Sequence, residues 1–130
     1  MTAPFVLDRA LILDRLGEDE EIFLLLIDLF LQDVDNNALV LGEALLLNKA
    51  DVLMREAHTI KSLLATLSDD VGAAKAAAIE QQAKLGNLDG LLPAVAAVQR
   101  RLFEVASSLS DLKPPVRWIS NWGLKLVIFS

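Results

Sequence analysis

Apolar residues recur at three- and four-residue spacing along almost the whole stretch from Leu7 to Leu109. This spacing places apolar side chains on one face of an α-helix, whereas a half-buried strand would alternate at every second residue. Only short polar or glycine-containing segments interrupt the pattern. The chain is therefore predicted to be all-α.

The interruptions divide this stretch into five helical segments. They are expected at about residues 7–16, 18–47, 51–67, 71–85 and 88–109. Gly17 ends the first segment, and the acidic residues 18–21 suit the N-terminus of the second, where the helix dipole favours negative charge. Asn36, Asn37 and Gly42 are points where the long second helix could bend or break. Because the breaks are short, we expect an antiparallel four-helix bundle with a short extra N-terminal helix.

A chain of 130 residues is about one domain in length, and we expect the bundle to occupy residues 6–110. Residues 111–130 then form a C-terminal tail of unknown role, in which Pro114 and Pro115 stop the last helix and Trp118 and Trp122 follow. The tail could dock on the bundle or on a partner, or it could be an extension unrelated to function. Since the helical pattern is complete before it, the tail should be dispensable for folding.

Composition excludes several classes of protein. The chain has no cysteine, which excludes disulfides and thiolate chemistry and fits a cytoplasmic location. Its net charge is −6 with no basic stripe, so nucleic acid is not an expected partner. The apolar run 22–30 contains Asp28 and is too short to span a bilayer, and the N-terminus does not read as a signal peptide. No glycine-rich phosphate loop is present, so ATP chemistry is not expected.

His58 is the only histidine, which excludes a metal site built from several histidines. The apolar residues of its segment that fall within one narrow arc, and so predict the buried stripe, are Leu53, Ala57, Ile60, Leu64 and Leu67. At about 100° per residue, His58 points roughly 140° away from Leu53. It is therefore expected to face solvent or a partner from the middle of a helix. Many exposed histidines are merely solvated, so this position alone does not establish a function.

The outward strip around His58 has a composition that suits phosphoryl chemistry. Its members at helical spacing are Asp51, Met54, Lys61, Ser62 and Ala65. An ordinary imidazole is largely neutral at pH 7 and can act as a nucleophile without an auxiliary base. A lysine one helical turn away can donate charge-assisted hydrogen bonds to phosphoryl oxygens. The small side chains leave room for another protein's active site to approach.

The segment Ala57-His58-Thr59-Ile60-Lys61-Ser62 resembles the signature of the histidine phosphotransfer (HPt) family. In that family a histidine is followed three residues later by lysine and then by a small residue, usually glycine. The resemblance covers about Val6 to Leu109, and residues 30–33, 51–53, 78–80 and 86–87 also support it. The departures are Ser62 and Ser68, where glycine is common, and Thr66, where asparagine is frequent. None of them removes a reactive group.

The resemblance implies that His58 accepts a phosphoryl group from an aspartyl phosphate of a response-regulator receiver domain and passes it on. It gives Lys61 a phosphoryl-contacting and docking role and makes Ser62 a permissive small residue; we place Met54 and Ala65 in the same partner-binding surface. The chain would then be a phosphocarrier without autokinase activity. It would need no cofactor of its own, since Mg²⁺ is expected only on the receiver, and a hybrid sensor histidine kinase would be a further partner.

Two other functions remain open from the sequence. A bundle of this kind could regulate a partner by docking alone, although the presence of both His58 and Lys61 argues against it. A structural dimerisation bundle could instead use the apolar second helix or the tryptophan-bearing tail.

Overall fold

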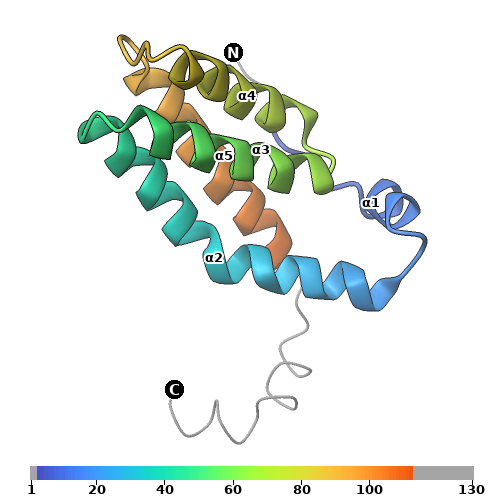
Figure 1. Ribbon diagram of the computed structural model, residues 1–130. Coiled ribbons are helices and arrows are strands. Elements are labelled where there is room, and N and C mark those ends of the chain that lie inside the picture. Colours follow the sequence, from blue (N-terminus) through green and yellow to red (C-terminus); the bar gives the residue numbers. More distant parts are fainter. Residues whose placement is uncertain (1–2, 113–130) are drawn as a thin grey trace, which may run out of the picture.

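The computed structural model describes residues 3–112, and every regular element there is an α-helix (Figure 1). The helices are α1 Arg9–Arg15, α2 Glu20–Leu46, α3 Ala50–Thr66, α4 Asp70–Lys84 and α5 Leu92–Ser110. The all-α prediction is confirmed, and most helix ends lie close to their predicted positions. Within the described range no helix is long and apolar enough to cross a membrane. Residues 113–130 of the predicted tail lie outside the described residues.

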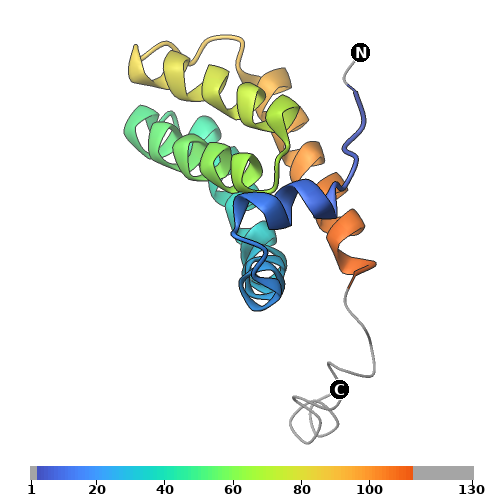
Figure 2. The ribbon, with the colours of Figure 1, turned by 90° about the vertical axis from the view of Figure 1, so that its right-hand side faces the viewer.

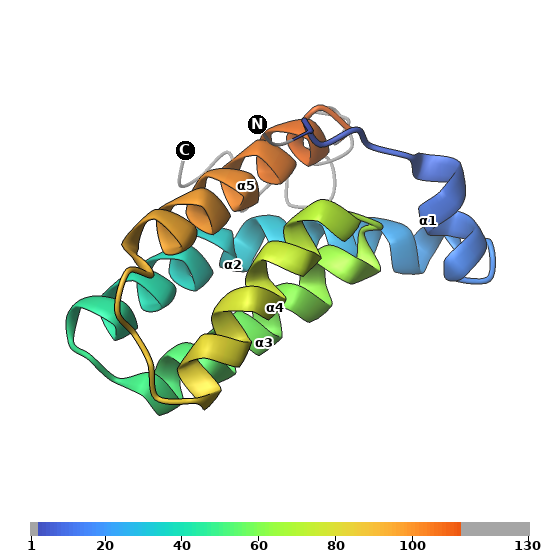
Figure 3. The same ribbon diagram turned by 90° about the horizontal axis from the view of Figure 1, so that it is seen from above.

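Helices α2 to α5 form a four-helix bundle in which each helix packs against two others. α2 contacts α3 and α5, and α4 contacts the same two helices. Residues 47–49 and 67–69 make the tight turns on either side of α3, so successive helices run antiparallel (Figure 1). The short helix α1 lies across one end of the bundle (Figures 2 and 3), where its Ile12 is fully buried.

The buried face of α3 is the stripe predicted from the sequence. Its residues Leu53, Ala57, Ile60 and Leu64 have no exposed surface, and Leu67 in the following turn is 2% exposed. Burying a leucine or isoleucine side chain stabilises a fold by about 1.5–3 kcal/mol relative to leaving it exposed. This stripe therefore fixes the rotation of α3 about its axis, and with it the side of the helix that faces outward.

α2 runs without a break through the predicted weak points. Asn37 is buried, and its Nδ2 donates to Glu56 Oε1 on α3 at 2.9 Å. Gly42 leaves room for the side chain of Gln99 on α5, whose Nε2 donates to the carbonyl oxygen of Ala38 at 2.9 Å. Contacts with both neighbouring helices thus offset the low helix propensity of asparagine and glycine.

Aspartate side chains cap the N-termini of three helices. Asp8 caps α1, Asp19 caps α2 and Asp69 caps α4, each accepting from the backbone N–H three residues later. The turn before Asp69 contains Ser68 with φ of +62°, in the left-handed region that favours glycine. This conformation explains why glycine is common at that place in the family that the sequence resembles.

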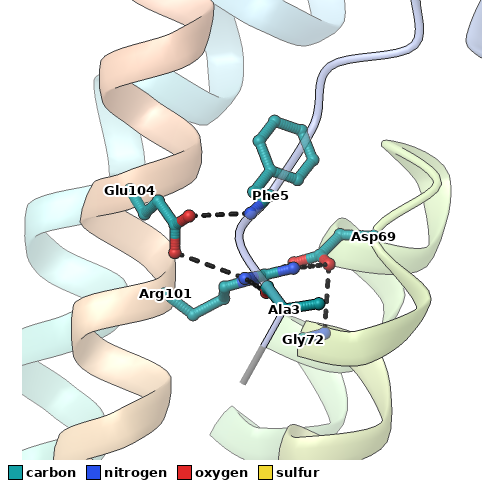
Figure 4. Close-up of polar contacts among 6 residues, drawn as sticks. All are labelled: Ala3, Phe5, Asp69, Gly72, Arg101 and Glu104. Carbon is teal, nitrogen blue, oxygen red and sulfur yellow. Dashed lines mark hydrogen bonds and ion pairs between the residues drawn. The ribbon is translucent and has the colours of Figure 1, made fainter. Parts of the chain in front are cut away.

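A buried ion pair joins the α3–α4 turn to α5 (Figure 4). Arg101 Nε and Nη2 donate to the two carboxylate oxygens of Asp69 at 2.8 and 2.7 Å, and the side chains are 5% and 2% exposed. One of these oxygens also accepts from the backbone N–H of Gly72. Hydrogen bonding to Asp69 raises the pKa of Arg101 above its usual value, so the guanidinium stays charged.

The same arginine holds the N-terminal segment (Figure 4). Arg101 Nη1 donates to the carbonyl oxygen of Ala3 at 2.6 Å and to Glu104 Oε1 at 3.3 Å. Glu104 Oε2 accepts from the backbone N–H of Phe5 at 2.7 Å, and the buried Phe5 ring lies 5.8 Å from the guanidinium carbon. The core therefore includes Phe5, one residue ahead of the predicted domain limit, because polar contacts rather than helical spacing hold it there.

We predict that Arg101→Leu lowers the free energy of unfolding by about 3–5 kcal/mol, because it leaves the Asp69 carboxylate buried without its partner. Urea unfolding followed by circular dichroism measures this difference. Arg100→Leu is the matched control, since Arg100 is exposed beside it, and should change the stability by less than about 0.5 kcal/mol. Equal effects of the two substitutions would contradict this role for the ion pair.

Candidate functional site

His58 lies in the middle of α3 and points away from the core. Its side chain is 58% exposed, while the neighbouring Ala57 is fully buried. The predicted outward position is therefore confirmed. An exposed imidazole on a helix anchored by a buried stripe is accessible to another protein without any rearrangement of the bundle.

One carboxylate, that of Glu80 on α4, contacts both functional side chains predicted on α3. Its Oε2 lies 2.9 Å from His58 Nδ1, and its Oε1 lies 2.8 Å from Lys61 Nζ. The Glu80 side chain is only 14% exposed, and that of Lys61 is 33% exposed. The three residues thus form a single polar cluster at the surface between the two helices.

The α3–α4 hairpin brings Glu80 to this place. Asp69 lies in the turn between these two antiparallel helices. His58 precedes Asp69 by the same number of residues as Glu80 follows it. Ala76 and Ile79 of α4 are fully buried, and α4 packs more extensively against α3 than against α5. We did not predict Glu80 as a site residue. The symmetry of the hairpin about its turn is the sequence signal that could have identified it.

The electrostatics of the cluster favour an ionised Glu80. The hydrogen bond from Lys61 is the main reason that the pKa of Glu80 is lowered; partial burial opposes this effect and the contact with His58 adds to it. An ionised carboxylate can only accept hydrogen bonds, so His58 Nδ1 must carry the proton in their contact. In a neutral imidazole the lone pair is then on Nε2. The contact with Glu80 therefore leaves Nε2 as the ring nitrogen with a free lone pair.

The imidazole forms part of an open hollow on this surface. The residues that line it are Met54, Arg55, His58, Thr59, Glu80 and Lys84. Of the other residues predicted on the outward strip, Met54 alone shares this hollow with His58, whereas Ser62 and Ala65 are exposed on α3 beyond it. Asp51 pairs with Arg55 at 3.9 Å on the exposed surface. The binding roles predicted for Met54, Ser62 and Ala65 remain predictions.

A known protein family matches the part of the chain that contains this cluster. Residues 25–112 match the family model described as the Hpt domain, a range that includes most of α2 and all of α3, α4 and α5. The match begins later than the resemblance seen in the sequence, so α1 lies outside it. No curated protein and no solved structure matches the chain.

We predict that Glu80→Gln lowers the free energy of unfolding near pH 7 by about 1 kcal/mol, because it removes the charge that pairs with Lys61. A lowered pKa in the folded state means that the stabilisation is present above the pKa of unfolded glutamate and is lost as the pH falls through the folded value. Urea unfolding from about pH 7 to about pH 3, across the usual glutamate pKa of about 4.3, should therefore show the two proteins converging in acid.

The matched control for this pH dependence is Glu43→Gln, which removes an exposed glutamate of α2 that makes no ion pair among the described residues. It should change the unfolding free energy little at any pH. A difference between Glu80→Gln and the parent that widens towards acid pH would show that Glu80 is not stabilised by its cationic neighbours.

Proposed function

The chain belongs to the Hpt domain family, and from this premise we propose that His58 carries a phosphoryl group between response-regulator receiver domains. Hpt domains act as phosphocarriers, not kinases, in two-component phosphorelays. The observation that carries the proposal for His58 is its contact with Glu80. An exposed imidazole held through Nδ1 by a carboxylate is a prepared nucleophile, whereas a merely solvated histidine needs no such partner.

The transfer is a displacement at phosphorus. His58 Nε2 attacks the phosphorus atom of an aspartyl phosphate on the receiver, in line with the bond from phosphorus to the aspartate oxygen. The N–P bond forms as the O–P bond breaks, and the aspartate leaves as a carboxylate. The ring then bears a positive charge with its proton on Nδ1, and the 2.9 Å contact with Glu80 stabilises that charge. Transfer of the phosphoryl group from His58 to the aspartate of a second receiver follows the same steps in reverse.

Lys61 supplies positive charge to the transferred group. It lies one helical turn from His58, and its Nζ is already held near the ring by Glu80 at 2.8 Å. An ammonium group at this position can donate to phosphoryl oxygens that the imidazole cannot contact. Because Lys61 is paired with Glu80 before transfer, the incoming phosphoryl group competes with Glu80 for the ammonium group.

The proposed reaction assigns Mg²⁺ and the acidic pocket that holds it to the receiver domain. We place a hybrid sensor histidine kinase upstream in the cytoplasm. The exposed small residues Ser62 and Ala65 support docking on this face, because they lie one and two helical turns from His58 and present little bulk. Met54 extends the same face on the N-terminal side.

The test of the proposal is His58→Gln, which should abolish acid-labile labelling by phosphorylated receiver domains. The helical circular-dichroism signal and the melting temperature should hardly change, because the side chain is exposed. Gln32→His combined with His58→Gln is the matched control, since it puts an exposed histidine on α2 away from Glu80. Labelling of the single variant would refute His58 as the acceptor, and labelling of the double variant would show that any exposed histidine suffices.

A second prediction concerns the docking face. Ser62→Trp should block transfer from receivers, because an indole one turn from His58 obstructs their approach, while the small donor phosphoramidate still labels His58. Ser107→Trp, at an exposed position on α5, is the control and should transfer at the parent rate. Initial rates of label transfer from a phosphorylated receiver measure both. Unimpaired transfer by Ser62→Trp would show that receivers do not dock on this face.

A further inference from the structure

A strip of apolar side chains lies uncovered on the N-terminal half of α2. Ile22, Leu25 and Leu29 are 43%, 55% and 45% exposed. They follow the helical spacing, so they form one continuous row along the helix. Beside the row, a small apolar groove is lined by Leu26, Phe30, Leu63, Thr66 and Leu67, where α2 meets α3. Contiguous exposed apolar surface of this kind indicates a binding site.

The strip is on the side of α2 that faces away from α5. Ala38 marks the α5 side, because its carbonyl oxygen accepts from Gln99. At about 100° per residue, Leu29 lies roughly 180° around the helix from Ala38. By the same measure the exposed carboxylates Glu21 and Asp35 lie between these two sides, on the outer surface of α2. A segment that passes from α5 around the outside of α2 would therefore meet acidic residues first and the apolar strip afterwards.

The chain leaves the core at a point from which it can reach this strip. Leu109 is fully buried, and Leu112 packs against the core. Because α5 runs antiparallel to α2 and Gln99 contacts Ala38, the end of α5 lies level with the N-terminal half of α2. The path half-way around a helix of about 10 Å diameter is about 16 Å. The residues from Leu112 to Trp118 span up to about 20 Å when extended.

The residues beyond Leu112 have the chemistry that this surface requires. Both tryptophans of the chain, Trp118 and Trp122, are there, followed by the apolar run 124–129. The charged residues of this segment are all basic, namely Lys113, Arg117 and Lys125, whereas all 18 acidic residues of the chain precede it. Left in water, a run with this β-propensity would favour aggregation.

We propose that residues 113–130 bind the apolar strip of α2 within the same chain. The tryptophans cover Ile22, Leu25 and Leu29, while the basic residues at the start of the segment lie near Glu21 and Asp35. A second copy of the bundle fits the strip less well. A two-fold interface there would bring the acidic residues of one copy against those of the other, which is repulsive.

Tryptophan fluorescence tests this binding directly, because Trp118 and Trp122 are the only tryptophans and the chain has no tyrosine. The emission of the folded full-length protein should be blue-shifted from that of the urea-unfolded chain and protected from iodide quenching. Leu25→Asp should shift the emission to the red and remove the protection. Leu39→Asp should do neither, although Leu39 is on the same helix and is 57% exposed against 55% for Leu25.

Circular dichroism of both variants must match the parent, since a substitution that unfolds the bundle would also shift the emission. A fluorescence change equal in the two variants would overturn the proposal. The proposal would also be overturned if protection from iodide quenching appeared only at higher protein concentration and the protein eluted earlier in size-exclusion chromatography. The segment would then bind a second copy of the chain. Protection that requires phosphatidylserine vesicles would show that the segment binds a membrane. None of these measurements depends on phosphoryl transfer.

Discussion

The buried ion pair between Arg101 and Asp69 determines how the two halves of the bundle fit together. Asp69 caps α4 while it binds the guanidinium of α5, so the α3–α4 turn cannot shift along α5 without breaking one of these contacts. A buried pair of this kind adds little net stability over an apolar contact, but removing one partner is costly. Its main effect here is geometric. The tight turn itself makes α3 and α4 antiparallel, and the ion pair fixes this hairpin, in which His58 lies opposite Glu80, against α5.

Glu80 gives the polar cluster its chemical character. The carboxylate neutralises Lys61 and orients the imidazole, and both contacts help to keep Glu80 ionised because they lower its pKa. In the proposed transfer, the phosphoryl group on Nε2 would bring further negative charge to the cluster, on the side of the ring away from Glu80. Repulsion between the phosphoryl group and the carboxylate would disfavour the loaded state, whereas Lys61 and the positive charge of the ring would stabilise it. A carrier would benefit from this balance, because its phosphohistidine must be formed readily and given up readily.

Much of the fold and the outward position of His58 could be predicted from the sequence, because both depend on periodic spacing within a helix. The stripe from Leu53 to Leu67 is buried, and the outward position of His58 follows from it. What was not predicted depends on contacts between segments that are distant in sequence. Glu80 reaches His58 through the hairpin, Asn37 is accommodated within α2 by Glu56, and Phe5 is held by Glu104. Residue spacing along a single helix contains no information about such partners.

The contacts of residues 3–5 also determine on which side of the bundle the N-terminal segment lies. Pro4 lies beside Lys75 of α4 and Arg101 of α5, and Lys75 is five residues from Glu80, or about 140° around α4. The N-terminal segment therefore approaches the bundle on a different side of α4 from the one where His58 meets Glu80. A fluorophore, affinity label or solid support attached ahead of Ala3 would leave the imidazole facing the solution. Attachment through this end is thus the orientation of choice for measuring partner binding on a surface.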